Sequence, residues 1–330
     1  MPQSFDTGKL VISLDFELFW GVRDKRTIEN YGANILGVQK VIPTLLEIFG
    51  KYNVKATFST VGFLFAKDKA QLLAACPVLK PEYTDFNLSP YHSLNEIGND
   101  QSDDPWHFGY PLLKLIKENG NHEIGTHTFS HYYCLELGQT IEVFKQDMLA
   151  ARRIAAAENI DVRSLVFPRN QFNEEYLSVC KEMGITSFRG NPQSWLYSGR
   201  NKNEESLFRR ILRFVDAYIN LTGYHCHTRA YLSSSIVANV AASRFLRPYS
   251  KKLSFLDSLR LRRIKRAMLH AARNKKLFHL WWHPHNFGIN LEQNLRFLDK
   301  ILRYYNELNS RYQFSSDTMS GIAEKLKASV

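Results

Sequence analysis

One stretch of the chain, His122-Glu-Ile-Gly-Thr-His-Thr-Phe-Ser-His131, places three histidines around a single glycine. His127 and His131 are four residues apart, so on a helical turn both imidazoles would project from the same face. Two neutral imidazole nitrogens that converge on one cation at about 2.0–2.1 Å are what a metal site needs. Histidines at this spacing also occur on ordinary helix surfaces and in protein cores. The stretch alone therefore leaves both interpretations open.

Two carboxylates follow the first apolar run, Lys9–Leu18. Alternate residues of a strand share a face, so Asp15 and Glu17 are expected to point the same way and Phe16 the opposite way. A carboxylate pair at a strand end suits a general base and a metal ligand. The alternative is a pair of surface acids at a strand tip.

Composition indicates a folded protein without a membrane span. The chain has 330 residues, 44% of them hydrophobic, and no apolar run near the 18 residues that a transmembrane helix needs. Its first residues lack the plan of a signal peptide, and its four cysteines are far apart in sequence. We therefore expect reduced thiols and a cytoplasmic location, with peripheral contact at the inner membrane face.

The net charge of +11 comes from one segment, Arg244–Lys276, which holds twelve basic residues and one acid, whereas the rest has 31 of each. On a helix, this segment would present a basic face, which predicts docking on an anionic membrane. The alternative is a helix that covers a barrel with solvated arginines. No recognised nucleic-acid fold accompanies the charge, so no nucleic acid is expected. The apolar side would hold Leu253, Leu256, Ile264 and Met268, and the basic side Arg262, Arg263, Lys265 and Arg266.

Strand and helix patterns alternate along the chain, and polar residues gather directly after the strands. This order predicts an α/β fold with a parallel barrel, whose active site lies where the carboxyl ends of the strands meet. We expect one domain over residues 1–330, with a loop insertion at 76–106 and a basic helical insertion at about 233–276. Strands are predicted at 9–18, 54–61, 161–167, 185–188, 277–282 and 312–315, and helices at 37–52, 108–118, 140–159, 173–183, 291–308 and 318–327.

Several of these motifs resemble the polysaccharide deacetylases of the NodB-homology superfamily. The histidine stretch is similar to that family's Gly-His-Glu-Ile-Gly-Asn-His-Thr-Trp-Ser-His motif, and Lys55-Ala-Thr-Phe-Ser-Thr-Val-Gly62 resembles its second-strand signature. Ser13-Leu-Asp15 occupies the place of the first motif, and Leu280-Trp-Trp-His283-Pro resembles the closing one. The chain is thus identified as a divergent member, which implies a distorted (β/α) barrel of about seven parallel strands.

The resemblance implies a role for each matching residue. Asp15 would be the catalytic base, Arg169 would orient it, and His283 would be the general acid. Glu17, His127 and His131 would bind one divalent metal, zinc by its ligands, with Co, Ni, Mn or Fe as alternatives. Two departures are evident: Asp-Phe-Glu replaces the family's Asp-Asp, which leaves open which acid binds the metal, and Arg169 follows its proline. Trp281, Trp282 and Arg189 are expected to line the substrate site, with core packing as the alternative for the tryptophans.

The implied activity is hydrolysis of an N-acyl group, acetyl or formyl, on a sugar of a cell-envelope or surface polysaccharide, such as O-antigen or capsule, or on its precursor. The precursor could be lipid-linked. Two alternatives remain open: a different C–N hydrolase of the superfamily, acting on a cyclic amide or a formamide, and an inactive glycan-binding relative. His225-Cys-His227 could form half of a second metal site, but no matching pair lies nearby in sequence.

Overall fold

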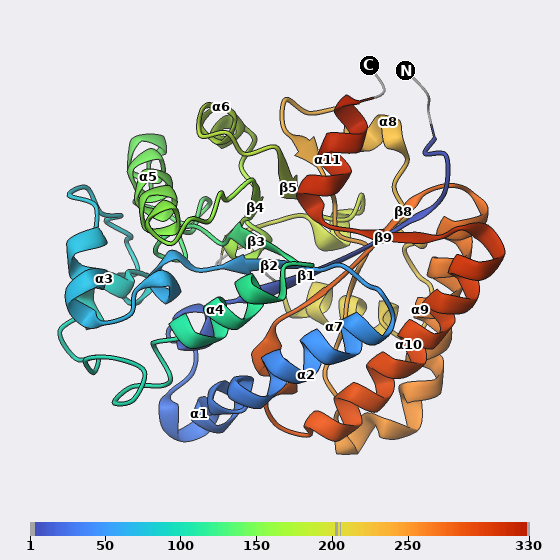
Figure 1. Ribbon diagram of the computed structural model, residues 1–330, viewed down its shortest axis with the longest axis horizontal. Coiled ribbons are helices and arrows are strands. Elements are labelled where there is room, and N and C mark those ends of the chain that lie inside the picture. The colour runs from blue at the N-terminus through green and yellow to red at the C-terminus, as the bar shows by residue number, and fades with distance from the viewer. Residues whose placement is uncertain (1–3, 202–203, 205, 329–330) are drawn as a thin grey trace.

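The computed structural model describes residues 4–201, 204 and 206–328 (Figure 1). Nine strands form one sheet in this part of the chain, and every strand pairing in it is parallel. The strands are β1 (Lys9–Phe16), β2 (Thr57–Thr60), β3 (Glu123–Thr126), β4 (Ser164–Val166), β5 (Ser187–Arg189), β6 (Ala238–Asn239), β7 (Arg244–Phe245), β8 (Leu277–Trp282) and β9 (Ser315–Asp317).

The sheet runs in the order β6-β5-β4-β3-β2-β1-β8-β7, and β9 pairs with the start of β1. Figure 1 shows the helices arranged around the outside of the sheet, and this confirms the predicted distorted (β/α) barrel. They are α1 (Ile28–Leu36), α2 (Val38–Lys51), α3 (Lys69–Ala75), α4 (Tyr110–Asn119), α5 (Ile141–Ala157), α6 (Leu177–Glu182), α7 (Leu207–Asp216), α8 (Arg229–Leu232), α9 (Asp257–Arg273), α10 (Leu291–Tyr312) and α11 (Met319–Lys327).

The first strand shows how alternation divides the molecule into layers. Leu10, Ile12 and Leu14 belong to the large apolar cluster shared with the surrounding helices. Ser13 and Asp15 point the other way and meet a side chain of β5, although three strands separate β1 from β5 in the sheet. They can meet only across the barrel interior. The interior of the barrel therefore holds polar side chains at the carboxyl end of β1, whereas Val11, on the same face, belongs to a smaller apolar cluster. The main apolar core lies between sheet and helices.

The basic segment is part of this architecture. It supplies β7 and α9, and α9 packs against α10, β1 and β8. Ile264 and Met268 are buried in the main apolar cluster, as expected for the apolar side of a helix that covers the sheet. The prediction for Arg263 is wrong, because it is buried and its Nη2 lies 3.5 Å from an Asp216 carboxylate oxygen.

Two further features bear on the expectations from sequence. All four cysteines are free thiols. No helix among the described residues has the length and hydropathy that crossing a bilayer requires. Residues 76–106 are mostly irregular, with short 3-10 turns at Phe86–Leu88 and Pro90–Ser93. The single-domain boundaries remain a prediction.

Candidate active site

The carboxyl ends of β1, β3, β5 and β8 bring the titratable residues together. Glu17 lies at the centre of the group. Its Oε2 is 3.4 Å from His127 Nε2 and 3.1 Å from His131 Nε2. One ligand atom from each of these three side chains lies within 4.8 Å of the other two, and all three residues are buried. Glu17, His127 and His131 are thus placed as a metal-binding group would be.

The histidine pair lies on an irregular loop after β3, so the expected helical turn is wrong. Thr128 and His131 both have positive φ, at 63° and 59°, which a helix cannot accommodate. The loop is held instead by Asp147 of α5. Its carboxylate accepts hydrogen bonds from the backbone N–H of Phe129 at 2.7 Å and of Ser130 at 3.1 Å, and from the Ser130 hydroxyl.

Hydrogen bonds on the far ring nitrogens set how the two histidines face Glu17. His127 Nδ1 lies 2.8 Å from the Val166 carbonyl, which only accepts, so this nitrogen carries the proton and Nε2 keeps its lone pair. His131 Nδ1 lies 3.1 Å from the hydroxyl of Tyr133. A second partner of this kind is what fixes the orientation of metal-binding imidazoles.

The electrostatics of this group also suit a cation. Burial lowers the pKa of His131 to about 4, so its imidazole is neutral at pH 7. Burial alone would raise the pKa of Glu17, but the nearby His283, His127 and His131 bring it well below its usual range. Neutral imidazoles beside an ionised carboxylate are the protonation states in which these groups bind metal. The donor set therefore fits a divalent ion such as zinc.

The second carboxylate is held by a different arginine from the one predicted. Asp15 makes a bidentate pair with Arg189, with distances of 2.6 and 2.7 Å from the two guanidinium nitrogens. Burial raises the pKa of Asp15, but the charge and hydrogen bonds of Arg189, together with the nearby His127 and His283, lower it by more, so the net shift is downward and the group is ionised. Below this pair, the hydroxyl of Ser13 accepts from Arg189 at 2.9 Å and lies 2.8 Å from His279 Nε2.

The prediction that Arg169 orients the base is thus wrong. Arg169 forms ion pairs with Asp24 and, at 3.5 Å, with Glu136, and it lies over the Tyr133 ring. Its φ of 55° lies in the left-handed region. The predicted substrate role of Arg189 changes for the same reason, because its guanidinium is buried against Asp15.

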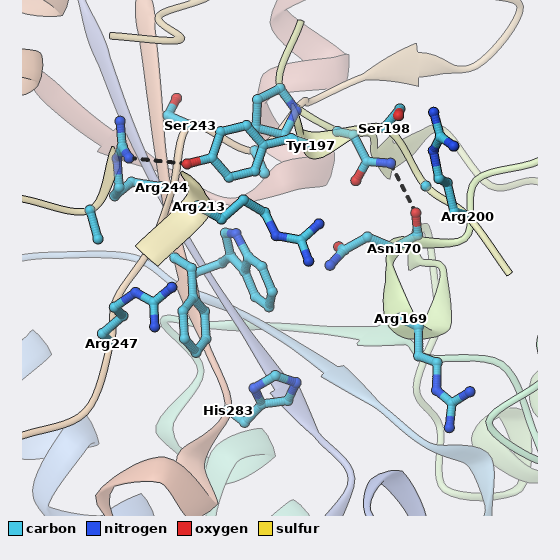
Figure 2. Close-up of a pocket in the computed structure, with 17 residues that line it drawn as sticks. Arg169, Asn170, Tyr197, Ser198, Arg200, Arg213, Ser243, Arg244, Arg247 and His283 are labelled. Atoms are coloured by element: carbon cyan, nitrogen blue, oxygen red, sulfur yellow. Dashed lines mark hydrogen bonds between the residues drawn. The ribbon is translucent and has the colours of Figure 1, made fainter. Parts of the chain in front are cut away.

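His283, at the end of β8, lies beside both carboxylates. Its Nε2 is 3.7 Å from an Asp15 oxygen and 3.6 Å from a Glu17 oxygen, and 24% of its side chain is exposed. His283 also lines the adjacent cavity, as does Arg169 (Figure 2). His285 stacks on His283 with ring centroids 4.9 Å apart, and its Nδ1 lies 3.9 Å from Glu17. Sequence analysis gave His285 no role, although it shares the His-Pro-His motif.

The two neighbouring tryptophans of β8 face opposite sides of the sheet. Trp281 is partly exposed, lines the cavity and lies under the Arg189 guanidinium, 4.1 Å from ring centroid to Cζ. Trp282 is fully buried and stacks on Phe287 in the apolar core. The expectation that Trp282 lines the substrate site is wrong, because strand alternation directs it outward.

His122 and His227 lie outside the candidate site, and each makes contacts that hold the fold together. His122 packs against Phe49 and Phe58, and its Nδ1 accepts the Ala56 N–H. His227 Nε2 lies 3.1 Å from the Ala242 carbonyl. Within the described residues, the only group of three metal-binding side chains is the one around Glu17, so the second metal site is not supported.

A sequence comparison finds a family model that matches part of the chain. The model of the family described as polysaccharide deacetylase matches residues 30–188. This confirms the resemblance inferred from the motifs, over a range that holds His127 and His131 and lies between the carboxylates and His283. No curated protein matches the chain in sequence.

Solved structures related to the polysaccharide deacetylases share the fold over nearly the whole chain. A protein from Mycobacterium smegmatis assigned as a polysaccharide deacetylase has a TM-score of 0.58 and 14% identity, and the match covers 99% of this chain and 94% of that one. A similarly assigned protein from Pseudomonas aeruginosa PAO1 has a TM-score of 0.53 and 10% identity, with 96% and 89% covered. Puue allantoinase has a TM-score of 0.54 and 10% identity, with 97% and 90% covered. At these identities the similarity establishes the fold alone.

Proposed function

We propose that the chain is a metal-dependent N-deacetylase that acts on a sugar of a cell-envelope or surface polysaccharide, or on its precursor. The observation that carries the proposal is the group at the barrel mouth. There, Glu17 contacts two histidines of the family motif, and His283 lies within 3.7 Å of Asp15 and Glu17.

Glu17, His127 and His131 would hold the divalent ion. When bound, such an ion is a Lewis acid that lowers the pKa of water toward about 7 and stabilises the negative charge that develops on the acyl oxygen. The hydrogen bond from His127 to the Val166 carbonyl and the one between His131 and the Tyr133 hydroxyl fix the two imidazoles for this purpose.

The other residues move protons. Asp15, kept ionised by Arg189, takes a proton from the attacking water as that water adds to the acyl carbon. His283 as imidazolium donates a proton to the nitrogen as the C–N bond breaks, so the sugar leaves as an amine and not as an amide anion. The products are a carboxylate and the amino sugar.

The proposal is tested by measuring release of acetate or formate from a panel of N-acylated sugars. Asp15→Asn and His283→Ala are each expected to reduce kcat by about 10²–10⁴-fold, the usual effect of removing a positioned acid or base. The matched control is His270→Ala, a histidine of α9 that contacts Asn274 outside the site. Melting temperatures show whether each variant is folded.

Three results would contradict the proposal. Near-normal turnover in either Asp15→Asn or His283→Ala would remove the assigned acid–base pair. Turnover of only cyclic amides or formamides would assign the site to a different C–N hydrolase. The absence of turnover on every substrate, with retained sugar binding, would identify an inactive glycan-binding relative.

A further inference from the structure

A strongly basic cavity adjoins His283. It has a volume of about 330 Å³, within the range of small-molecule sites. Its described lining residues include five arginines and neither Asp nor Glu. Figure 2 shows the Arg213 side chain extending into the middle of the view, between Arg247 and Asn170 and above His283. The five are Arg169, Arg200, Arg213, Arg244 and Arg247.

Protein carboxylates neutralise only part of this charge. Arg169 is held by Asp24 and Glu136. Asp216 pairs with Arg244 at 2.8 Å, but it is shared with Arg263, whose Nη2 is 3.5 Å away. One carboxylate therefore serves two buried guanidinium groups, and the described residues that line the cavity carry a positive excess.

Two arginines of the cavity also have unused hydrogen-bonding capacity. Arg244 is buried, yet its Nε and Nη2 have no hydrogen-bond partner among the described residues. The Arg247 carbonyl accepts a hydrogen bond from Arg260, but the Arg247 guanidinium has no hydrogen bond or ion pair with any described residue and lies over the Phe214 ring. Its pKa is lowered by burial and also by the positive charges of Arg213 and Arg244. Buried guanidinium nitrogens without partners, such as those of Arg244, are costly, and an anion that binds them would relieve that cost.

The type of anion follows from the number of donors. A single carboxylate satisfies one guanidinium in a bidentate pair, whereas phosphate or diphosphate presents more oxygens and more charge to several arginines at once. The anion would lie next to the reaction, because Trp281 and His283 line the same cavity.

We propose that this cavity binds a phosphate or diphosphate group of the substrate, which makes the substrate a phosphorylated sugar and not a neutral polysaccharide. Two sources share this chemistry, a nucleoside-diphosphate sugar and a lipid-diphosphate sugar. The assignment of the sugar rests on the proposed deacetylase function, whereas the anion site rests on the arginines alone.

The first measurement is calorimetric titration of the holoenzyme with inorganic diphosphate and with N-acetylglucosamine. Arg247→Gln and Arg213→Gln remove one charge each and keep a polar side chain. Each is expected to weaken diphosphate binding by about 10–100-fold, the range for loss of a charge-assisted hydrogen bond. Arg247→Lys should recover part of the affinity, because it restores charge without the paired donors. Arg266→Gln, which removes an exposed arginine of α9, is the matched control and should bind as the wild type does.

Diphosphate also binds metal ions, so the titration is repeated on His127→Ala/His131→Ala. Binding that persists there and is lost in Arg247→Gln belongs to the cavity. Equal binding by wild type and the Arg213→Gln/Arg247→Gln double variant, or binding that is lost with the two histidines, overturns the proposal.

The second measurement compares kcat/KM for three N-acetylated substrates: a nucleoside-diphosphate sugar, a polyprenyl-diphosphate sugar in detergent and a neutral oligosaccharide. At least a tenfold higher kcat/KM is expected for one phosphorylated substrate than for the neutral oligosaccharide. The better of the two phosphorylated substrates shows whether the bound phosphate is nucleoside-linked or lipid-linked. Efficient hydrolysis of the neutral substrate without inhibition by diphosphate would support the deacetylase function and contradict the anion site. Arginine-dependent diphosphate binding without turnover of any substrate would support the anion site and contradict the deacetylase function.

Discussion

At the scale of single residues, two arginines near the barrel mouth differ in what they hold. Arg189 makes a bidentate pair with Asp15, whereas Arg169 pairs with Asp24 and Glu136. Both follow or end a strand, and both are arginines in a polar motif, so the sequence offers little to separate them. The difference lies in the direction of each side chain relative to the barrel interior.

Arg189→Gln is therefore expected to damage catalysis far more than Arg169→Gln does. Loss of Arg189 leaves Asp15 buried without its partner, which also costs about 3–5 kcal/mol of folding stability. We expect kcat to fall by about 10²-fold or more in Arg189→Gln, with an intermediate value for Arg189→Lys, which keeps the charge but not the paired donors. Rates are compared at a temperature below the melting transition of every variant.

For Arg169→Gln the main expected effect is a lower melting temperature, because two ion pairs are lost outside the reacting groups. If Arg169→Gln lost as much kcat as Arg189→Gln while remaining folded, the base-orienting role of Arg189 would be untenable.

At the scale of elements, close packing around glycines allows the site to form. A Cβ added at Gly21 would lie 1.9 Å from Glu17 Cδ, so a larger residue there would displace the carboxylate. A Cβ at Gly62 would lie 2.7 Å from the Phe129 Cα, within the histidine loop. The second-strand signature thus ends on a glycine because the loop of His127 and His131 packs against it.

The same loop depends on α5 through Asp147. Asp147→Ala would leave the buried N–H groups of Phe129 and Ser130 unpaired, at about 1–3 kcal/mol each. We expect the free energy of unfolding to fall by about 2–4 kcal/mol. Metal affinity should fall by about 10–100-fold, as when a residue that supports a ligand is removed. Chemical denaturation and elemental analysis of protein purified without chelators measure the two quantities.

Two further variants serve as the controls for Asp147→Ala. Asp161→Ala removes an exposed carboxylate near the end of α5 and should change neither quantity. His127→Ala/His131→Ala should lose the metal outright. A metal content in Asp147→Ala equal to that of the wild type would show that the loop keeps its shape without α5.

These elements also show what sequence could and could not predict. The long apolar strands and amphipathic helices were predicted from periodicity, for example the strand ending at Trp282 and the helix from Leu291. The two-residue strands β6 and β7 were missed, because so short a segment has no period to detect. The conformation of residues 127–131 was wrong, because the contacts of Asp147 that set it come from a different element. The pairing of Arg189 with Asp15 depends on how the sheet curls, which brings β5 and β1 to face each other across its interior.

At the scale of the whole molecule, exposed apolar residues lie on the elements that form the cavity. Arg213 and Ala217 line the cavity at the end of α7, and the same helix exposes Phe208 at 64%. Arg247 also lines it, and the 3-10 segment Lys251–Leu256 begins four residues later, at most about 14 Å away along the chain. Large exposed apolar side chains beside a basic cavity are the surface expected where a lipid-linked phosphate is bound.

This surface shows which residues of the basic segment could contact a membrane. The apolar side of α9 is buried in the core, so α9 cannot insert it into a bilayer. The exposed candidates are Lys251, Lys252 and Phe255, the last being 75% exposed. Each basic residue near an anionic surface contributes about 1 kcal/mol of attraction.

We therefore expect the protein to co-sediment with anionic vesicles at low salt and to dissociate from them as the salt concentration rises. It should not bind neutral vesicles. Lys251→Gln/Lys252→Gln should weaken binding about tenfold or more, since about 2 kcal/mol of attraction is lost. Lys114→Gln/Lys117→Gln, which removes the same charge from exposed positions on α4, is the control and should bind as the wild type does. Equal binding by both double variants would assign the attraction to overall charge, and no binding at low salt would exclude this face as a membrane contact. Either result would favour the nucleoside-linked over the lipid-linked phosphate, because only the lipid-linked substrate requires the cavity to face a bilayer.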